Sequence, residues 1–287
     1  MEFLYHYTSL ETLALILKNK TISFNNLLNV DDIEEAETED MGKFGRFVYV
    51  SCWTEDNVES IPLWNLYTPD MHGVRLRLPK FPFKKYSYNA GQFHFSQDVE
   101  TYINIESIYN ENKASIVANQ PSLIEVEYTD NKKLLFPKVK TESCENGFQK
   151  YTNAKDISEV TGIELSYFFE ELGKFKHENW QFQKERRYLL TSTPKGLRES
   201  TPPSFEKQKE FIRRIENENL KPPYQNIFLN LDENAIEHLE VVFGPKMSEA
   251  EKILAISLLK QYAPNTLYRD SSLRIVYGNL KLNHNRT

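Results

Sequence analysis

Short strand-like and helix-like runs alternate irregularly along this chain, and this irregularity is the strongest constraint on its fold. Residues 3–8 (FLYHYT) are aromatic and apolar and predict a strand, whereas residues 10–20 (LETLALILKNK) predict a helix with Ser9 as its N-cap. Residues 21–24 (TISF) return to strand character. Because such elements follow one another without a regular strand–helix–strand rhythm, the sequence favours the α+β class over a doubly wound parallel sheet.

The length of the chain and its turn-forming residues favour one domain. The sequence has 287 residues with only 10 glycines and 13 prolines, which argues against long flexible linkers. We therefore expect a single domain over residues 1–287. Residues 80–160 give the weakest periodicity and are a candidate insertion.

Charge, cysteine usage and hydropathy exclude several classes of protein. A formal net charge of −6 argues against bulk affinity for nucleic acid, although it is compatible with a local basic groove. Cys52 and Cys144 lie far apart and fit a reducing compartment without a disulfide framework. The sequence shows neither a signal peptide nor an apolar run long enough to span a membrane. We expect a soluble, cytoplasmic protein.

Familiar catalytic and metal-binding motifs are absent from the sequence. There is no glycine-rich phosphate loop, no H-E-x-x-H and no G-x-S-x-G, and the histidines are scattered, so no metal site is predicted. Tyr86, Tyr88 and Phe93 could stack nucleobases, but aromatic residues are abundant throughout the chain and core packing is the favoured interpretation.

Two charged segments allow both a structural and a functional interpretation. Seven of the ten residues from 31 to 40 are acidic, which predicts a solvated loop or helix face, with an ordered aspartate near a substrate as the alternative. Glu185 and Arg187 lie two residues apart in the strand-like run ERRYLLTST and should share one face. They are either a structural ion pair, buried or outward-facing, or a carboxylate held in a cleft beside fixed positive charge.

Six short segments, taken in order, carry a resemblance to a known family. They are YHYTS, VSCWTED, PLWNLY, HGVRLRL, KHENWQFQKERRY and VVFGP, and all but the last join an aromatic residue to a polar or charged one. In this order they resemble the bacterial family called domain of unknown function 2971. The resemblance covers nearly the whole chain except residues 80–160, and it does not by itself imply a function.

A second, looser resemblance does imply a function. A strand with H-Y-T, then a leucine-rich helix and a short strand, is similar to the opening of ADP-ribosyltransferase-like folds, which have a split central β-sheet with flanking helices. This resemblance implies that NAD is the substrate and that Glu185, His6 and Gln183 are catalytic. The cofactor-binding candidates are His6, Tyr7, Thr8, Ser51, Trp53, Trp64 and Tyr67, with Arg75 and Arg187 as candidates for the pyrophosphate. Gln183 departs from the E-x-E pattern, so arginine as the acceptor is put in doubt.

The chemistry of NAD cleavage is consistent with these residue types. The reaction develops a positively charged ribose, which a carboxylate such as that of Glu185 would stabilise, and an arginine would hold the pyrophosphate. The resemblance implies an ADP-ribosyltransferase or NAD glycohydrolase, with a protein or nucleic acid as acceptor and a toxin or phage-defence role as a setting. His6 would then face a cleft, whereas the structural alternative is a buried histidine that is hydrogen-bonded to the acidic segment.

Two other functions stay open at this point. The first is a nucleotide or ligand sensor that binds without turnover. The second is a metal-dependent nuclease that uses Asp31, Asp32 and Glu185, because carboxylates of this kind can hold Mg²⁺.

Overall fold

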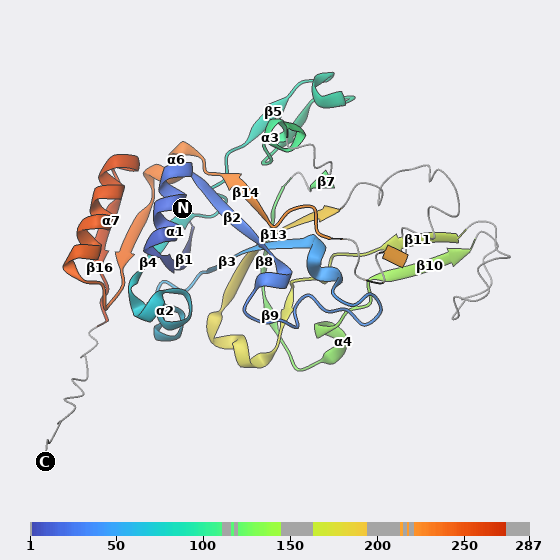
Figure 1. The fold of residues 1–287 in the computed structure, drawn as a ribbon, viewed down its shortest axis with the longest axis horizontal. Helices are drawn as coiled ribbons and strands as arrows, with labels where there is room; N and C mark the ends of the chain where they lie inside the picture. Colours follow the sequence, from blue (N-terminus) through green and yellow to red (C-terminus); the bar gives the residue numbers. More distant parts are fainter. Residues whose placement is uncertain are drawn as a thin grey trace, which may run out of the picture. The chain divides into compact units, whose positions relative to one another are not determined.

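A computed structural model describes residues 2–110, 116–117, 120–144, 163–193, 213–214, 217 and 221–273. The chain divides into two compact units, each assembled from separate stretches of sequence (Figure 1). Unit 1 comprises residues 1–20, 55–82 and 233–287, and unit 2 comprises residues 21–54 and 83–232. Strands and helices mix without a repeating order, which confirms the α+β class.

Four strands of unit 1 pair in the order β1–β4–β15–β16. The pairs β1/β4 and β4/β15 are antiparallel, whereas β15/β16 is parallel. The elements of this unit are β1 (Phe3–Ser9), α1 (Leu10–Asn19), α2 (Ile61–Tyr67), β4 (Gly73–Pro79), α6 (Glu233–Glu237), β15 (Glu240–Phe243), α7 (Glu249–Tyr262) and β16 (Leu267–Asp270).

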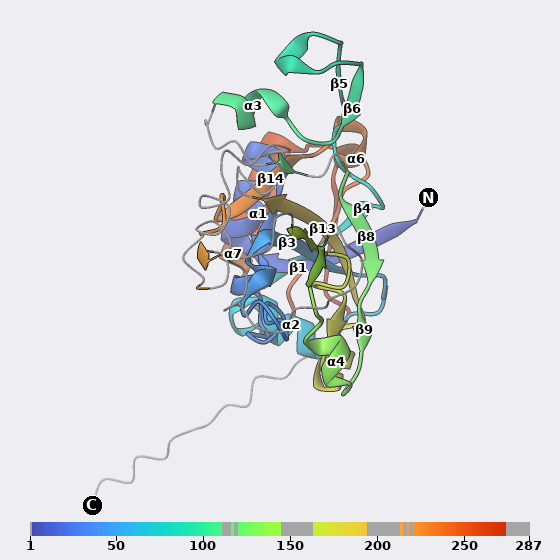
Figure 2. The same ribbon diagram turned by 90° about the vertical axis from the view of Figure 1, so that its right-hand side faces the viewer.

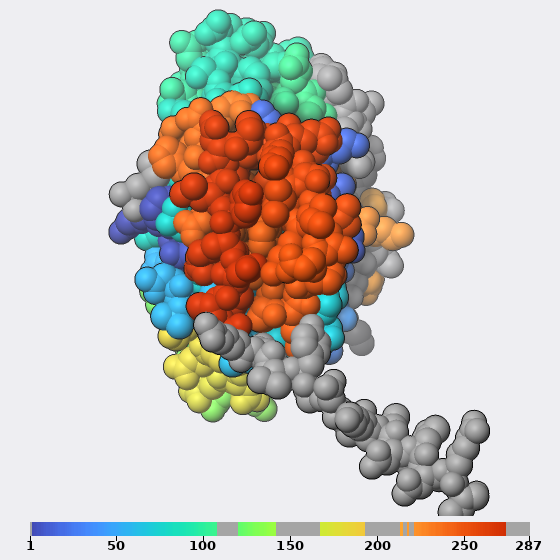
Figure 3. Space-filling view, turned by 90° about the vertical axis from the view of Figure 1, so that its left-hand side faces the viewer, coloured from blue at the N-terminus to red at the C-terminus, as the bar shows by residue number. Residues whose placement is uncertain are grey.

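The helices of unit 1 begin where the sequence places capping side chains. The Ser9 hydroxyl accepts a hydrogen bond from the Thr12 N–H at the start of α1, and Ser60 caps α2, in which Pro62 lies in the first turn. Ser248 and Glu251 form a reciprocal capping box at the start of α7. The start of α1 at Ser9 is confirmed as the sequence predicts it. In Figure 3 the C-terminal part of unit 1, coloured orange to red, faces the viewer.

Unit 2 is built on antiparallel strand pairs. β2 (Thr21–Asn26) pairs with β14 (Asn226–Asn230) and β3 (Val48–Thr54), and β3 pairs with β13 (Glu185–Thr193). β13 also pairs with β7 (Ile116–Val117) and β8 (Ser122–Glu125). The remaining elements are β5 (Tyr86–Tyr88), β6 (Val99–Thr101), α3 (Ile105–Asn110), β9 (Glu127–Tyr128), α4 (Lys132–Leu135), β10 (Lys140–Cys144), β11 (Ile163–Tyr167) and β12 (Phe175–Lys176).

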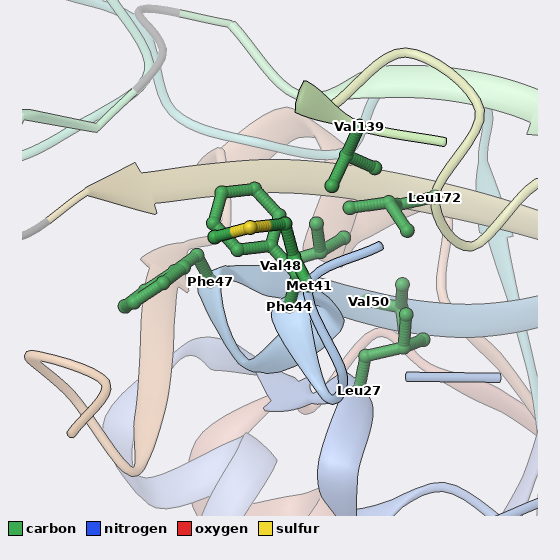
Figure 4. Packing of buried hydrophobic residues seen from close by; sticks show 8 residues of the cluster. All are labelled: Leu27, Met41, Phe44, Phe47, Val48, Val50, Val139 and Leu172. Atoms are coloured by element: carbon green, nitrogen blue, oxygen red, sulfur yellow. The ribbon is translucent and has the colours of Figure 1, made fainter. Parts of the chain in front are cut away.

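An apolar cluster holds the segment after β2 against the sheet of unit 2 (Figure 4). The cluster joins this segment to strand β3 and to two loops, through Leu27, Met41, Phe44, Phe47, Val48, Val50, Val139 and Leu172. Each of these side chains is at most 2% exposed. The acidic residues 31–40 therefore lie in a segment that is fixed at both ends by buried apolar contacts.

One element of unit 2 differs from its prediction, and two predicted elements cannot be compared. The pattern of residues 162–175 predicts an amphipathic helix that ends near Gly173, but residues 163–167 form β11, which pairs antiparallel with β10. This short run of apolar residues fits both the helical period of 3.6 and the strand period of 2. The pairing with a neighbouring strand stabilises the strand conformation. The predicted helix over residues 204–220 and the predicted last strand over 273–278 lie almost entirely outside the described residues.

In the described part of the chain, no helix is long and apolar enough to cross a membrane.

Two glycines of unit 1 allow backbones to approach closely. A Cβ on Gly73 would lie 2.5 Å from the Thr8 carbonyl oxygen, and one on Gly244 would lie 2.3 Å from the Met71 carbonyl oxygen.

We predict that Gly73→Ala lowers the free energy of unfolding by about 1–3 kcal/mol, because the added methyl group overpacks a closed site. Urea denaturation at neutral pH measures this change. As a control, Gly91→Ala meets no atom within 4 Å and should lose only about 1 kcal/mol through its positive φ of 89°. An unchanged unfolding midpoint for Gly73→Ala would contradict the account.

Candidate functional site

The most highly charged buried site of unit 2 is centred on Arg187, which is fully buried in β13. Its Nε donates to Glu185 Oε1 at 2.5 Å, and one NH2 bond reaches Glu185 Oε2 at 3.1 Å. The other edge of the guanidinium group donates to Glu35. NH1 bonds to Oε2, and NH2 bonds to Oε1 at 3.0 Å. NH1 also donates to the Gly173 carbonyl at 3.0 Å. All five N–H donors of Arg187 are therefore used.

Lys176 completes this site, which we call the buried ion network (Glu35, Lys176, Gln183, Glu185 and Arg187). Its Nζ lies 3.2 Å from Glu35 Oε1 and 3.2 Å from Glu185 Oε2, and it donates to Gln183 Oε1 at 2.8 Å. All five residues are at most 7% exposed. Two carboxylates thus face two cations, so the formal charges of the network cancel.

Local backbone geometry brings the network together. Lys184 ends a 3₁₀ turn over Glu178–Gln183 with φ of 44°, and β13 begins at the next residue. Glu185 and Arg187 then share one face of the strand because they lie two residues apart. Gly173 has φ of 75°, a conformation that suits glycine, and its carbonyl reaches Arg187.

The network keeps Glu185 ionised in spite of its burial. Burial by itself would raise the pKa of this carboxyl group, but Arg187 and Lys176 outweigh it and lower the pKa to about 2. Burial raises the pKa of the neighbouring Cys52 thiol, and the negative charge of Glu185 raises it further. Glu185 is thus a permanent carboxylate at neutral pH, and Cys52 is a neutral thiol.

The structure separates some of the predicted site residues of unit 2. Gln183, Glu185 and Arg187 lie together in the network. Ser51 and Trp53 lie on the opposite face, because Arg187 is paired across the strands with Cys52, and successive residues of a strand point to opposite faces. The Trp53 indole N–H donates to the Ser51 hydroxyl at 3.0 Å, and both side chains are 4% exposed. A phosphate at Arg187 would have to displace an existing hydrogen bond.

A second cluster, in unit 1, is centred on Arg75 of β4, which is 2% exposed. Its guanidinium carbon lies 4.6 Å from the ring centroid of Tyr5 and 5.8 Å from that of Tyr7. NH1 donates to the Asn57 carbonyl at 3.1 Å, whereas the buried Nε has no hydrogen-bond partner in the described part of the chain. An anionic group could satisfy this donor.

Aromatic packing and one carboxylate complete this Arg75 cluster. The rings of Tyr7 and Trp64 meet edge to face at 4.9 Å, and the Trp64 indole N–H donates to Glu59 Oε2 at 3.2 Å. Glu59 also accepts hydrogen bonds from the hydroxyls of Ser271 and Ser272 and from the Ser272 N–H. Burial raises the pKa of Glu59, but these hydrogen bonds and the charge of Arg75 outweigh it, so the pKa is lowered.

The other predicted site residues of unit 1 lie apart from Arg75 or at its edge. His6 is paired with Leu76 and Thr8 with Val74, so their side chains point to the face of β1 opposite to Tyr7 and Arg75. His6 is half-buried, and Thr8 is 6% exposed. Tyr67 is partly buried against the apolar cluster of Tyr7 and Trp64. The catalytic role predicted for His6 stays a prediction, because the described geometry leaves it untested.

Three charged residues of these sites are not among the candidates that the sequence predicts. Glu35 is one of seven acidic residues in a row of ten, and no sequence signal distinguishes it from its neighbours. Lys176 lies in KHENWQFQKERRY, and no pattern in the sequence marks it as a buried lysine. Glu59 lies just before Ser60, the cap of α2, and its serine partners lie more than 200 residues away.

Among the described residues, no group of three His, Cys, Asp or Glu side chains could hold a metal ion. The positive charges of Lys176 and Arg187 would also repel a cation from Glu185. The Gln183 amide donates to Asp31 Oδ2 at 3.3 Å. The geometry gives no support to the metal-dependent nuclease.

No family model matches this chain, and no curated protein or solved structure matches it either. The resemblances described for the sequence therefore stay predictions, and the function has to be argued from the two sites.

We predict that the buried ion network makes the protein acid-sensitive through Glu185. Its folded-state pKa of about 2 lies below the ordinary value of 4.5, so its contribution to stability is complete above pH 4.5 and falls as the pH drops toward 2. The contribution is about 3 kcal/mol. Urea unfolding at pH 7, 4.5 and 3 measures it. Glu185→Gln should be less stable at pH 7 and lose less stability on acidification. Equal pH dependence of the two proteins would contradict this assignment.

Proposed function

We propose that this protein is an ADP-ribosyltransferase-like protein that takes NAD as its substrate and holds the pyrophosphate through Arg75. The observation that carries the proposal is the buried Arg75 guanidinium whose Nε lacks an acceptor. Arginine binds phosphate oxygens through parallel N–H bonds, and a phosphate would satisfy the donor that the protein leaves open.

The surroundings of Arg75 support an anionic ligand with a flat ring. The charge of Arg75 lowers the pKa of Glu59. Glu59 accepts hydrogen bonds from Trp64, Ser271 and Ser272. Among the contacts of the described residues, it makes no direct ion pair with Arg75. Tyr5 is half-buried and stacks on Arg75, so part of its ring surface is accessible. Access to the guanidinium would require the exposed Asn57, whose carbonyl covers NH1, to move aside.

The proposed reaction breaks the bond between the nicotinamide nitrogen and C1′ of the ribose. Nicotinamide leaves with the bonding electron pair, and a nucleophile on water, protein or nucleic acid forms the new bond at C1′ and gives up its proton. The positive charge that develops on the ribose requires a carboxylate. Glu185 is the residue that the ADP-ribosyltransferase resemblance assigns to this role, and its low pKa is consistent with the ionised form that the role demands.

One observation favours a second candidate, which is nucleotide binding without turnover. Both oxygens of Glu185 already accept hydrogen bonds from Arg187, and Lys176 lies beside Oε2. The side chain is 5% exposed. A carboxylate engaged in this way would have to leave its partners before it could contact a ribose, so a sensor that binds NAD through Arg75 would need no change in unit 2.

We predict that NAD binds the purified protein and that Arg75→Met weakens binding at least about tenfold, because the variant lacks the guanidinium fork. Isothermal titration calorimetry measures the binding. Lys246→Met, which removes a positive charge paired with Asp70 at the surface of unit 1, is the matched control and should bind like the wild type. Thermal melting establishes that each variant is folded.

Release of nicotinamide, measured with and without cell lysate, separates the two candidates. Release that disappears in a folded Glu185→Gln variant, with NAD binding retained, supports the enzyme. Binding without release under any condition supports the sensor. Absence of NAD binding in the wild type, or equal binding by Arg75→Met, contradicts the proposal in both forms.

A further inference from the structure

The hairpin formed by β5 and β6 has a surface made almost entirely of aromatic and polar side chains. The strands pair antiparallel, with Tyr86 opposite Thr101 and Tyr88 opposite Val99. No residue from 84 to 100 is buried, although the segment contains Tyr86, Tyr88, Phe93 and Phe95. The expectation that these rings pack in the core is therefore wrong for this hairpin. Figures 1 and 2 both show it extending away from the other strands of unit 2.

The rings are held in fixed orientations. Tyr86 and Tyr88 lie two residues apart on one face of β5, with their rings within 8° of parallel and their centroids 6.3 Å apart. The Tyr86 hydroxyl donates to Asn230 Oδ1 at 3.0 Å, and the Tyr88 hydroxyl accepts from the Ile105 N–H at 3.1 Å. Because the hydroxyl ends are anchored, the rings lose little freedom when a ligand stacks on them.

The tip of the hairpin carries backbone strain that places two more rings beside Tyr88. Gly91, Phe93 and His94 have φ values of 89°, 47° and 65°. A left-handed conformation costs roughly 1–2 kcal/mol for a residue with a Cβ, so two such residues in succession are an unusual feature. Phe93 meets Tyr88 edge to face at 5.5 Å, and the Phe95 centroid lies 6.3 Å from that of Tyr88. Strain of this kind is typical of ligand-binding loops.

The charges of the hairpin leave one cation beside the rings. Lys85 pairs with Glu100 at 2.5 Å, and Asp98 accepts from the Ala90 N–H at 2.8 Å. The Lys84 ammonium lies 5.3 Å from the Tyr86 ring centroid, and no carboxylate of the described residues pairs with it. A lysine next to a stacking ring suits a phosphate that follows a stacked base.

We propose that the β5–β6 hairpin binds single-stranded nucleic acid, with bases stacked on its aromatic rings and a phosphate at Lys84. Rings two residues apart on one strand face are how sheet proteins stack successive bases. The hairpin carries exposed amide groups at Asn89, Gln92 and Gln97, and Val99 is its only aliphatic side chain larger than alanine. A protein-binding surface usually adds aliphatic and Met or Trp anchors to its rings, so the composition favours bases over a protein partner. The inference goes beyond the proposed NAD site and does not depend on it.

Fluorescence anisotropy of the full chain with fluorescein-labelled 12-nucleotide dT and rU strands tests this proposal, without NAD. We expect micromolar binding at 50 mM salt. The double variant Phe93→Leu/Phe95→Leu keeps apolar side chains but removes two rings and should bind about tenfold more weakly. Lys84→Met should reduce the slope of log affinity against log salt concentration by about one, because one phosphate contact is lost. Phe228→Leu changes an aromatic residue that is 60% exposed on β14 and should bind like the wild type.

Two results overturn the proposal. One is no binding by the wild type at 50 mM salt, and the other is equal binding by the folded double variant. Sedimentation velocity is run in parallel. If the double variant lowers a self-association of the wild type while the strands do not bind, the rings form a protein interface instead. Because NAD is left out, failure here says nothing about Arg75, and failure of NAD binding says nothing about the hairpin.

Discussion

The interaction on which unit 2 most depends is the double bidentate contact of Arg187 with Glu185 and Glu35. Burial of an arginine is costly unless its donors are satisfied, and here two carboxylates and the Gly173 carbonyl accept all five. Glu35 comes from the acidic segment and Glu185 from β13, so one side chain joins parts of the chain that are 150 residues apart. Removal of Glu35, Glu185 or Arg187 would leave an uncompensated charge in the interior.

The same network defines what unit 2 can do chemically. It holds Glu185 ionised, as a reaction through a cationic ribose requires, but it also occupies the oxygens that would contact the sugar. The buried arginine of unit 1 has a different environment. Arg75 is stacked on tyrosine rings and keeps an unsatisfied Nε, so the energetic penalty of burial is only partly relieved within the described residues. An anionic ligand is better accommodated at Arg75 than at Arg187.

The local parts of the fold could be predicted from the sequence because their signals are local. Ser9, Ser60 and the Ser248–Glu251 capping box mark helix starts, and the alternation of Arg75 and Arg77 with apolar residues marks β4. The sequence also indicates that Glu185 and Arg187 share a face. It could not indicate that Glu35, rather than a neighbouring acid, completes the network, because that choice depends on long-range packing.

The face on which each candidate residue lies likewise depends on strand register. Strand register sets Ser51 apart from Glu185, and His6 apart from Tyr7, by alternation alone. Residues that are close in the sequence can therefore point away from one another. The aromatic residues of the β5–β6 hairpin could not be told from core residues, because composition alone does not distinguish rings that pack on one another from rings inside a sheet.

A double-mutant cycle on Glu35 and Arg187 tests most directly whether the buried ion network organises unit 2. Free energies of unfolding in urea at pH 7 are measured for the wild type, Glu35→Gln, Arg187→Met and the double variant, with the exposed Glu34→Gln as a control. The account predicts a coupling energy of about 2–3 kcal/mol between the two sites and a change within about 0.5 kcal/mol for the control. Additive effects of the two substitutions, within about 0.5 kcal/mol, would contradict it.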